Sequence, residues 1–245
     1  MPKEDKSQHI PQATKLKDAV DIKSKYKLTS NQNLVIEKIL DKNTKCIFLS
    51  GVAGTAKTYS AILAGLQLLN RKQVSSIIYV RSAVESSDSK LGYLPGDIDS
   101  KIQPYLEPLM DKLSELLSKN DIDKLLKDKR IETKAISFLR GLSWNAKFII
   151  NDECQNASFK EIVTIITRLG EFSKIILCGD PTQSDINGKS GFKDMMNLFN
   201  NQESMDNGIF CFDLAEDDIV RSKFVKFVVG KLNLFKNAKS TKTNL

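Results

Sequence analysis

The segment FLSGVAGTAKTYS, residues 48–60, places a lysine and a threonine directly after a run of small residues. Gly51, Lys57 and Thr58 occupy the positions that the phosphate-loop pattern G-x-x-x-x-G-K-[ST] requires, whereas Ala56 replaces its second glycine. In such a loop, backbone N–H groups surround nucleotide phosphates, the lysine reaches the β- and γ-phosphates, and the hydroxyl holds Mg²⁺. Ala56 keeps its N–H group, and holding it at positive φ costs about 1–2 kcal/mol. The alternative is a glycine-rich turn without a ligand. The expected ATP contacts in this segment are Gly51, Val52, Ala53, Gly54, Thr55, Ala56, Lys57, Thr58 and Tyr59.

Two acidic residues follow a second apolar run, in KFIINDECQN. Phe148–Ile150 predicts a buried strand, so Asp152 and Glu153 stand at its carboxyl end, the edge where parallel sheets bind ligands. There Asp152 would hold Mg²⁺ through water, and Glu153 would polarise the water that attacks ATP. The alternative is a solvated acidic turn. The phosphate loop upstream favours the catalytic interpretation.

A third apolar run ends in an amide-bearing turn, KIILCGDPTQSD. Gly179 and Asp180 end the predicted strand, and Gln183 follows three residues after Asp180. The amide of Gln183 would hydrogen-bond the γ-phosphate or the attacking water. Taken alone, the segment is equally typical of an ordinary turn with proline and aspartate.

These residues need a sheet to bring them together. Short apolar runs predict strands at 45–50, 76–80, 146–150, 174–179 and 208–214, and the helical patterns between them favour a parallel sheet covered on both faces. Residues 28–40 predict a helix with Ser30 as N-cap and an apolar side of Leu34, Ile36, Ile39 and Leu40. Residues 82–130 interrupt the rhythm as a long insertion, with helices expected at 110–119 and 121–128.

Composition limits the class of protein. The 245 residues are 41% hydrophobic and contain no apolar run long enough for a membrane span. The four cysteines lie in or beside apolar runs without metal-binding spacing, which indicates buried, reduced thiols in the cytoplasm. Residues 221–245 hold seven basic and no acidic side chains, equal to the whole net charge of +7. This segment would bind nucleic-acid phosphates, or it is a solvated terminus.

The motifs together resemble the PhoH family, ATPases related to the motor core of superfamily 1 helicases. The similar stretches are GVAGTAKT, RSAVESSDSKLGYLPGDIDSKIQPYLEPLMDKL, RGLSWNAKFIINDECQNAS, ILCGDPTQSDI and DDIVRSKFV, in family order over roughly residues 28–230. The KLGYLPGD…KIQPYLEPL stretch is the most specific, since general ATPases lack it. The chain departs from the family pattern at Ala56 (glycine in the family), Cys154 (alanine) and Asn151 (usually aliphatic).

The resemblance adds roles at matching positions. TSNQ is similar to the helicase glutamine motif, which implies that Gln32 reads the adenine edge. Arg221 in DDIVRSKFV matches a family arginine, which implies that it acts on the γ-phosphate, within its own site or in a neighbour's site. Arg140 in FLRG is a second candidate, and for either arginine a surface ion pair is the alternative.

The resemblance implies an α/β, RecA-like P-loop NTPase sandwich of three layers with a parallel sheet and a helical insertion. It also implies a short, single-domain, phage-type member that acts in the cytoplasm, of the host if viral. We expect a flexible basic leader at 1–27, the ATPase domain at 28–232 and a lysine-rich tail at 233–245. The expected activity is Mg²⁺-dependent ATP hydrolysis coupled to RNA or single-stranded DNA, with no membrane partner. The catalytic residues would be Lys57, Glu153, Gln183, Arg221 and Arg140, and the Mg²⁺ ligands Thr58 and Asp152.

Two other functions remain open from the sequence. One is a nucleotide-binding regulator that does not hydrolyse ATP, and the other is a ribonuclease-associated RNA-binding protein. Helicase motors of this superfamily place ATP between two RecA-like domains, whereas each motif occurs once here. We therefore expect a homo-oligomer, with a hexameric ring as the best hypothesis.

Overall fold

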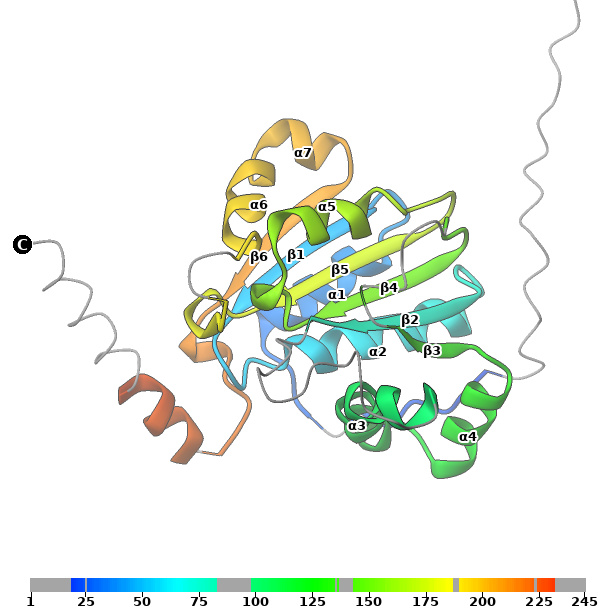
Figure 1. The fold of residues 1–245 in the computed structure, drawn as a ribbon. Coiled ribbons are helices and arrows are strands. Elements are labelled where there is room, and N and C mark those ends of the chain that lie inside the picture. The colour runs from blue at the N-terminus through cyan, green and yellow to red at the C-terminus, as the bar shows by residue number, and fades with distance from the viewer. Residues whose placement is uncertain are drawn as a thin grey trace, which may run out of the picture.

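The computed structural model of the chain describes residues 19–24, 26–82, 98–134, 136, 143–186, 190–222 and 224–231. Its centre is a six-stranded sheet in the order β3-β2-β4-β5-β1-β6, in which every neighbouring pair is parallel (Figure 1). The strands are β1 (Cys46–Gly51), β2 (Ser76–Arg81), β3 (Ile131–Lys134), β4 (Lys147–Asp152), β5 (Lys174–Gly179) and β6 (Ile209–Leu214). The helices are α1 (Ser30–Leu40), α2 (Lys57–Asn70), α3 (Ile98–Leu116), α4 (Lys119–Lys127), α5 (Phe159–Ile166), α6 (Phe192–Phe199) and α7 (Gln202–Asp206), and residues 224–231 are also helical.

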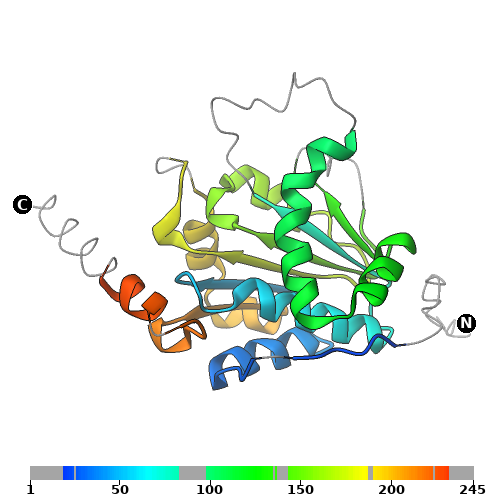
Figure 2. The same ribbon diagram turned by 90° about the horizontal axis from the view of Figure 1, so that it is seen from below.

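Helices cover both faces of this sheet and make three layers. One core cluster joins α1, α2, α3 and α4 to one face, and a second joins α5 and α6 to the other. Figure 2 shows α3, in green, lying beside α2 on the first face. Strand β1 explains the arrangement, because Ile47 and Leu49 enter the first cluster while Cys46 and Phe48 enter the second. The apolar runs are therefore strands buried on both faces, which confirms the predicted α/β fold class.

The five predicted strands are present, but the sequence missed the sixth, β3. This strand has only four residues, Ile-Glu-Thr-Lys, and it lies at the edge of the sheet beside β2. Three of its four side chains are only half-buried, so it has no apolar run to reveal it. The strand forms because it pairs with β2, and its own sequence has no hydrophobic pattern that predicts it.

The helices of the predicted insertion are present as α3 and α4, although α3 begins at Ile98 instead of 110. Its sequence includes Pro104 and Pro108, which normally mark a helix end. Residues 83–97 of the insertion lie outside the described residues, as do residues 1–18 of the leader and 232–245 of the tail.

The N-cap of α1 is Thr29, so the expectation of Ser30 was wrong by one residue. The Thr29 hydroxyl accepts from the backbone N–H of Gln32, and the Gln32 side chain accepts from the N–H of Thr29. This capping box satisfies two N–H groups that a helix start leaves open. The buried side of α1 includes Val35, whereas Leu34, expected on that side, is 49% exposed.

All four cysteines are free thiols; three are buried and Cys211 is half-buried. Among the described helices, none combines the length and apolar character that a bilayer crossing requires.

Candidate nucleotide-binding site

A pocket of about 250 Å³ lies where β1, β4 and β5 end. The loop between β1 and α2 forms one wall, and residues that follow β4 and β5 form another. The pocket therefore joins the three predicted motifs, although about 130 residues separate the first from the last. This is the edge where open parallel sheets bind their ligands.

The phosphate loop has the backbone conformation expected for binding an anion. Gly54 has φ +89°, and Ala56, which precedes α2, is left-handed at φ 57° and ψ 29°. A side chain at Gly51 would bring its Cβ within 2.9 Å of the Leu214 Cβ, so only glycine fits beside β6. The ammonium of Lys57 donates to the carbonyls of Gly51 (2.6 Å) and Val52 (3.1 Å). The lysine thus lies across its own loop, at the start of the α2 helix.

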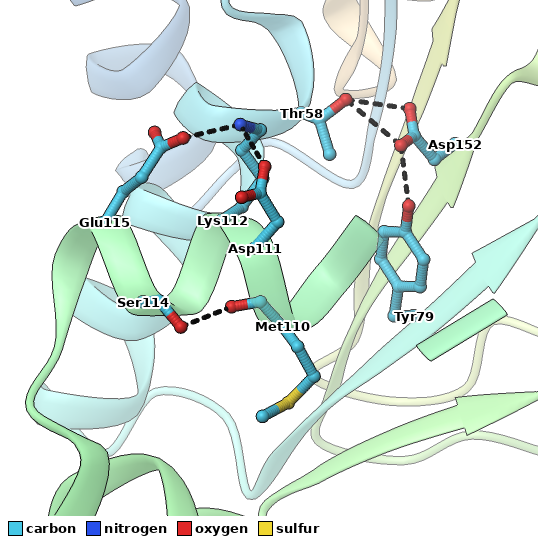
Figure 3. A network of polar contacts seen from close by, with 8 residues as sticks. All are labelled: Thr58, Tyr79, Met110, Asp111, Lys112, Ser114, Glu115 and Asp152. Carbon is cyan, nitrogen blue, oxygen red and sulfur yellow. Dashed lines mark hydrogen bonds and ion pairs between the residues drawn. The ribbon is translucent and has the colours of Figure 1, made fainter. Parts of the chain in front are cut away.

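A hydroxyl and a carboxylate meet beside this loop (Figure 3). The Thr58 hydroxyl lies 2.9 and 3.1 Å from the two carboxylate oxygens of Asp152, and the Tyr79 hydroxyl donates to Asp152 at 2.7 Å. Asp152 is only 6% exposed, and burial raises the pKa of its carboxyl above the usual value. Burial and the neighbouring Asp152 also raise the pKa of Tyr79, which therefore stays a donor. Hydroxyl and carboxylate oxygens are the ligands that Mg²⁺ prefers, so these residues fit the ion.

Glu153 begins a chain of side-chain contacts between β4 and β5. Its backbone is left-handed at φ 54°, and its carboxylate accepts from the Gln155 amide at 2.7 Å. The other end of that amide accepts from the backbone N–H of Asp180 at 3.0 Å. Asp180 in turn accepts from the Gln183 amide at 2.7 Å. The predicted base and the predicted amide are thus linked through Gln155 and Asp180.

Gln155 was missed by sequence reasoning. It stands two positions after the predicted base but carries no acid–base chemistry of its own. Its partner Asp180 is 25 residues away in the chain and comes close only because β4 pairs with β5. Its side chain is 2% exposed and both ends are bonded, so it orients Glu153.

Arg221 lines the pocket of its own chain. The backbone N–H of Val220 donates to the carbonyl of Gly54, and a Cβ on Gly54 would lie 3.1 Å from the Arg221 Cγ. The segment after β6 therefore lies against the phosphate loop. Arg140, the other predicted arginine, lies outside the described residues.

Gln32 lies behind the loop instead of lining the pocket. Its side chain is fully buried, and its amide donates to the carbonyls of Thr55 (3.0 Å) and Asp218 (2.7 Å). Contact with an adenine would replace one of these bonds. In this arrangement Gln32 ties the phosphate loop to α1 and to the segment before Arg221.

The insertion helix α3 adds a charged pair that the sequence did not predict. Lys112 and Glu115 line the pocket, 2.6 Å apart, and the ammonium of Lys112 also lies 2.8 Å from Asp111 (Figure 3). Nearby, Tyr26 and Tyr59 pack edge to face with ring centres 5.1 Å apart, and both line the pocket. An aromatic wall with a charged edge is suited to a nucleoside.

Two residues that depart from the family pattern contact each other. The amide of Asn151 donates to the sulfur of Cys154 at 3.2 Å, and its oxygen accepts from Ser82 at 3.0 Å. Both Asn151 and Cys154 are fully buried on either side of the two carboxylates. They form one polar contact beneath the site, where the family pattern has apolar groups.

Similarity to known proteins identifies the family. The PhoH family, described as PhoH-like protein, matches residues 24–233. The chain is 38% identical over 203 residues to the PhoH-like protein of Mycobacterium leprae, which covers 82% of this chain and 56% of that relative. It is 34% identical over 188 residues to the PhoH-like protein of Bacillus subtilis, covering 77% and 58% of the two chains. Protein PhoH2 of Bacillus subtilis is 35% identical over 158 residues, covering 63% of this chain and 36% of that relative.

The chain spans about half the length of the curated PhoH-like relatives that it matches. The family match extends over most of the sequence, and the parallel sheet has the RecA-like P-loop architecture. The chain belongs to the PhoH family.

Proposed function

We propose that this protein binds ATP with Mg²⁺ and hydrolyses it. One observation carries the proposal: Lys57, the Thr58–Asp152 pair and the linked Glu153 and Gln183 all border one pocket at the carboxyl edge of the sheet. The three elements of phosphoryl transfer to water, namely a phosphate cradle, a metal site and a base, are thus in reach of one another.

Each side chain has a separate role. Lys57 exchanges its two loop carbonyls for phosphate oxygens, and Thr58 and Asp152 hold Mg²⁺, which neutralises charge on the phosphates when bound. Glu153, oriented by Gln155, polarises the attacking water. Gln183 and Arg221 lie at the pocket wall, where they would contact the γ-phosphate and the negative charge that develops on it.

Two variants test this proposal. Lys57→Ala should abolish ATP binding, because the phosphates lose their principal positive charge. Glu153→Gln should bind ATP with near-normal affinity but hydrolyse it at least a hundredfold more slowly, since general-base catalysis typically contributes about 10²–10⁴-fold. Fluorescent-nucleotide titration and phosphate release measure the two properties separately. ATP binding without any turnover in the wild type would instead establish the non-hydrolysing regulator.

We further propose that RNA or single-stranded DNA stimulates the ATPase. The support is the relationship of the family to helicase motors and the basic segment 221–245, of which residues 232–245 lie outside the described residues. Truncation after residue 232 should weaken RNA binding and leave basal ATP turnover intact. RNA cleavage that survives both Lys57→Ala and Glu153→Gln would favour the ribonuclease-associated alternative.

Residues 28–232 are proposed as the ATPase unit, and the protein as a homo-oligomer, with a hexameric ring as the preferred form. The support is that each motif of the site occurs once in the chain, so a neighbouring copy would complete the cleft. The four free thiols support a reducing compartment such as the cytoplasm.

A further inference from the structure

A second cavity lies at the opposite edge of the sheet, where the strands begin. Its volume is about 780 Å³, and its walls come from the segments that precede β1, β2 and β5. None of the ATPase residues discussed above lines it. The volume lies within the range of ligand pockets, about 300–1,000 Å³, and is enough for a nucleotide or two.

The lining of this cavity is strongly basic. Lys42, Lys45, Lys72 and Lys174 face a single acid, Glu171, which gives a formal charge of +3. Three of these lysines are exposed, whereas Lys174 is only 8% exposed.

Lys174 is a buried cation that the carboxylate of Asp41 attracts only from beyond ion-pair distance. Its ammonium donates to the backbone carbonyl of Asp41 and forms no ion pair with the residues that the structure describes. The carboxylate of Asp41 lies 3.5 Å from Lys38 instead. Burial lowers the pKa of Lys174 to about 8, so its charge is costly in the free protein. A bound anion would offset that cost.

An aromatic ring stands among these charges. Phe172, in the wall of the cavity, is 41% exposed and left-handed at φ 59°. Positive φ is a genuine outlier for a bulky residue, and such strained positions concentrate at ligand sites. A phenylalanine held in solvent contributes little to the core, but it offers a flat surface on which a base can stack.

We propose that this cavity binds single-stranded nucleic acid, with its phosphates on the lysines and a base against Phe172. The inference rests on the nucleic-acid coupling of the proposed function and gives it a location. Protein grooves for single strands combine these two features, basic side chains along the backbone and aromatic rings under the bases.

The location implies that nucleic acid and ATP do not compete. Strands β1 and β5 each have six residues, so the two sites lie roughly 20 Å apart at about 3.3 Å per residue. Each strand begins at the basic cavity and ends at the nucleotide pocket. Bound nucleic acid can therefore influence the phosphate loop only through the elements that join the two edges, strands β1 and β5 and helix α2.

Fluorescence anisotropy of a labelled 20-nucleotide oligouridine tests the proposal on the full chain without ATP. The double variant Lys45→Glu/Lys72→Glu should bind at least tenfold more weakly than the wild type. The slope of log affinity against log salt should fall by about 1.4, roughly 0.7 for each lost phosphate contact. A matched control, Lys119→Glu/Lys127→Glu, makes the same charge change on exposed positions of α4, away from the cavity.

The stacking contact is tested separately from the charges. Phe172→Ala should weaken binding by about five- to a hundredfold, the range seen when a stacking residue is removed, with an unchanged salt slope. Phe172→Tyr keeps the ring and should bind like the wild type, which separates stacking from a folding defect.

Equal losses in the cavity variant and in the α4 control would overturn the proposal, because general charge would then explain the binding. The proposal would also be overturned if the cavity variant lost binding of inorganic pyrophosphate but bound oligouridine as tightly as the wild type. The cavity would then be a site for small anions. Failure of the wild type to bind oligouridine would refute the nucleic-acid coupling as well. The proposed ATPase is judged independently by phosphate release from the same samples.

Discussion

Ala56 is left-handed in the free protein, at φ 57°, so its backbone strain is present before any nucleotide binds. Ala56→Gly should relieve about 1–2 kcal/mol of that strain. The added freedom of glycine in the unfolded chain costs about 0.5–1 kcal/mol. The free energy of unfolding should therefore rise by up to about 1.5 kcal/mol. Affinity for ATP should change less than about twofold, because the glycine relieves the same strain in the free and in the ATP-bound protein.

Urea unfolding and nucleotide titration of the same two samples measure these quantities. A glycine variant that unfolds more easily would contradict the left-handed conformation. A variant that binds ATP tightly where the wild type does not would show that the alanine strain is created by the ligand.

Asp152 carries a cost that Mg²⁺ would relieve. Burial raises its pKa in the folded protein, so its contribution to stability is fully present below the unfolded value and is lost as the pH rises through the folded one. Asp152→Asn has no such charge. The variant should therefore gain stability relative to the wild type as the pH rises from about 4 towards neutrality.

Thermal unfolding with and without Mg²⁺ and ATP measures how far these ligands offset the cost of the buried Asp152 charge. The ligands should stabilise the wild type and have little effect on Asp152→Asn, because only the wild type retains the metal site. Equal stabilisation of both proteins would remove Asp152 from the metal site.

The residues predicted from the sequence are those whose chemistry demands a fixed spacing. Lys57 and Thr58 follow their glycines along the chain, and Asp152 and Glu153 follow their strand, so a local pattern reveals them. Gln155 depends on a partner, and Lys112 on a pocket, that only the fold brings close. The amide of Gln155 has a role only because the fold places Asp180 beside it, and no local sequence pattern reveals that contact.

At the scale of elements, α3 connects the insertion to the nucleotide pocket. Lys112 carries a positive charge into the pocket wall, and Asp111 and Glu115 compensate it. Glu115→Ala should tighten ATP binding, because it leaves Lys112 less neutralised. Lys112→Ala should weaken binding, because it leaves two carboxylates near the phosphates. Each effect should be up to about fivefold, the range for partly exposed ion pairs, and smaller at high salt.

The prediction is supported if Glu115→Ala tightens ATP binding while Lys112→Ala weakens it. A general loosening of α3 would instead weaken ATP binding in both variants. Lys119→Ala, on the exposed side of the neighbouring helix α4, provides the control. Equal weakening by the two α3 variants would assign the pair to helix packing.

Elements with a pattern of their own were predictable, and elements formed by their neighbours were not. The apolar runs of β1, β4 and β5 are buried on both faces, so hydrophobicity alone identifies them. Strand β3 depends on β2 for its pairing, and α3 continues through two prolines. The predicted N-cap of α1, Ser30, was one residue off because the adjacent hydroxyl residues Thr29 and Ser30 are both good N-caps.

At the scale of the molecule, the sheet separates two pockets of different charge and chemistry. The carboxyl edge combines Lys57 with buried carboxylates, whereas the amino edge is basic. Strands β1 and β5 join the two edges and lie side by side within the sheet. Strand pairing is rigid compared with loops, so we expect small shifts at one edge to reach the other through these strands.

The proposed ring makes a prediction about which arginine crosses between subunits. Arg221 lines the pocket of its own chain beside Gly54, so we expect it to act in its own site. Arg140 is then the candidate for the neighbour's site. Mixing Lys57→Ala with Arg140→Ala, each inactive alone, should restore ATP turnover, since a site with Lys57 can receive Arg140 from the adjacent copy.

About a quarter of the interfaces in an equal mixture would pair the two variants in the productive order, so roughly that share of wild-type activity is expected. Mixing Lys57→Ala with Arg221→Ala should restore nothing, because Lys57 and Arg221 must belong to one chain. An arginine finger contributes about 10³-fold or more to turnover, so the difference between the two mixtures is large. Light scattering on the active wild type supplies the independent test: a fully active monomer would exclude shared sites, whatever the mixtures show.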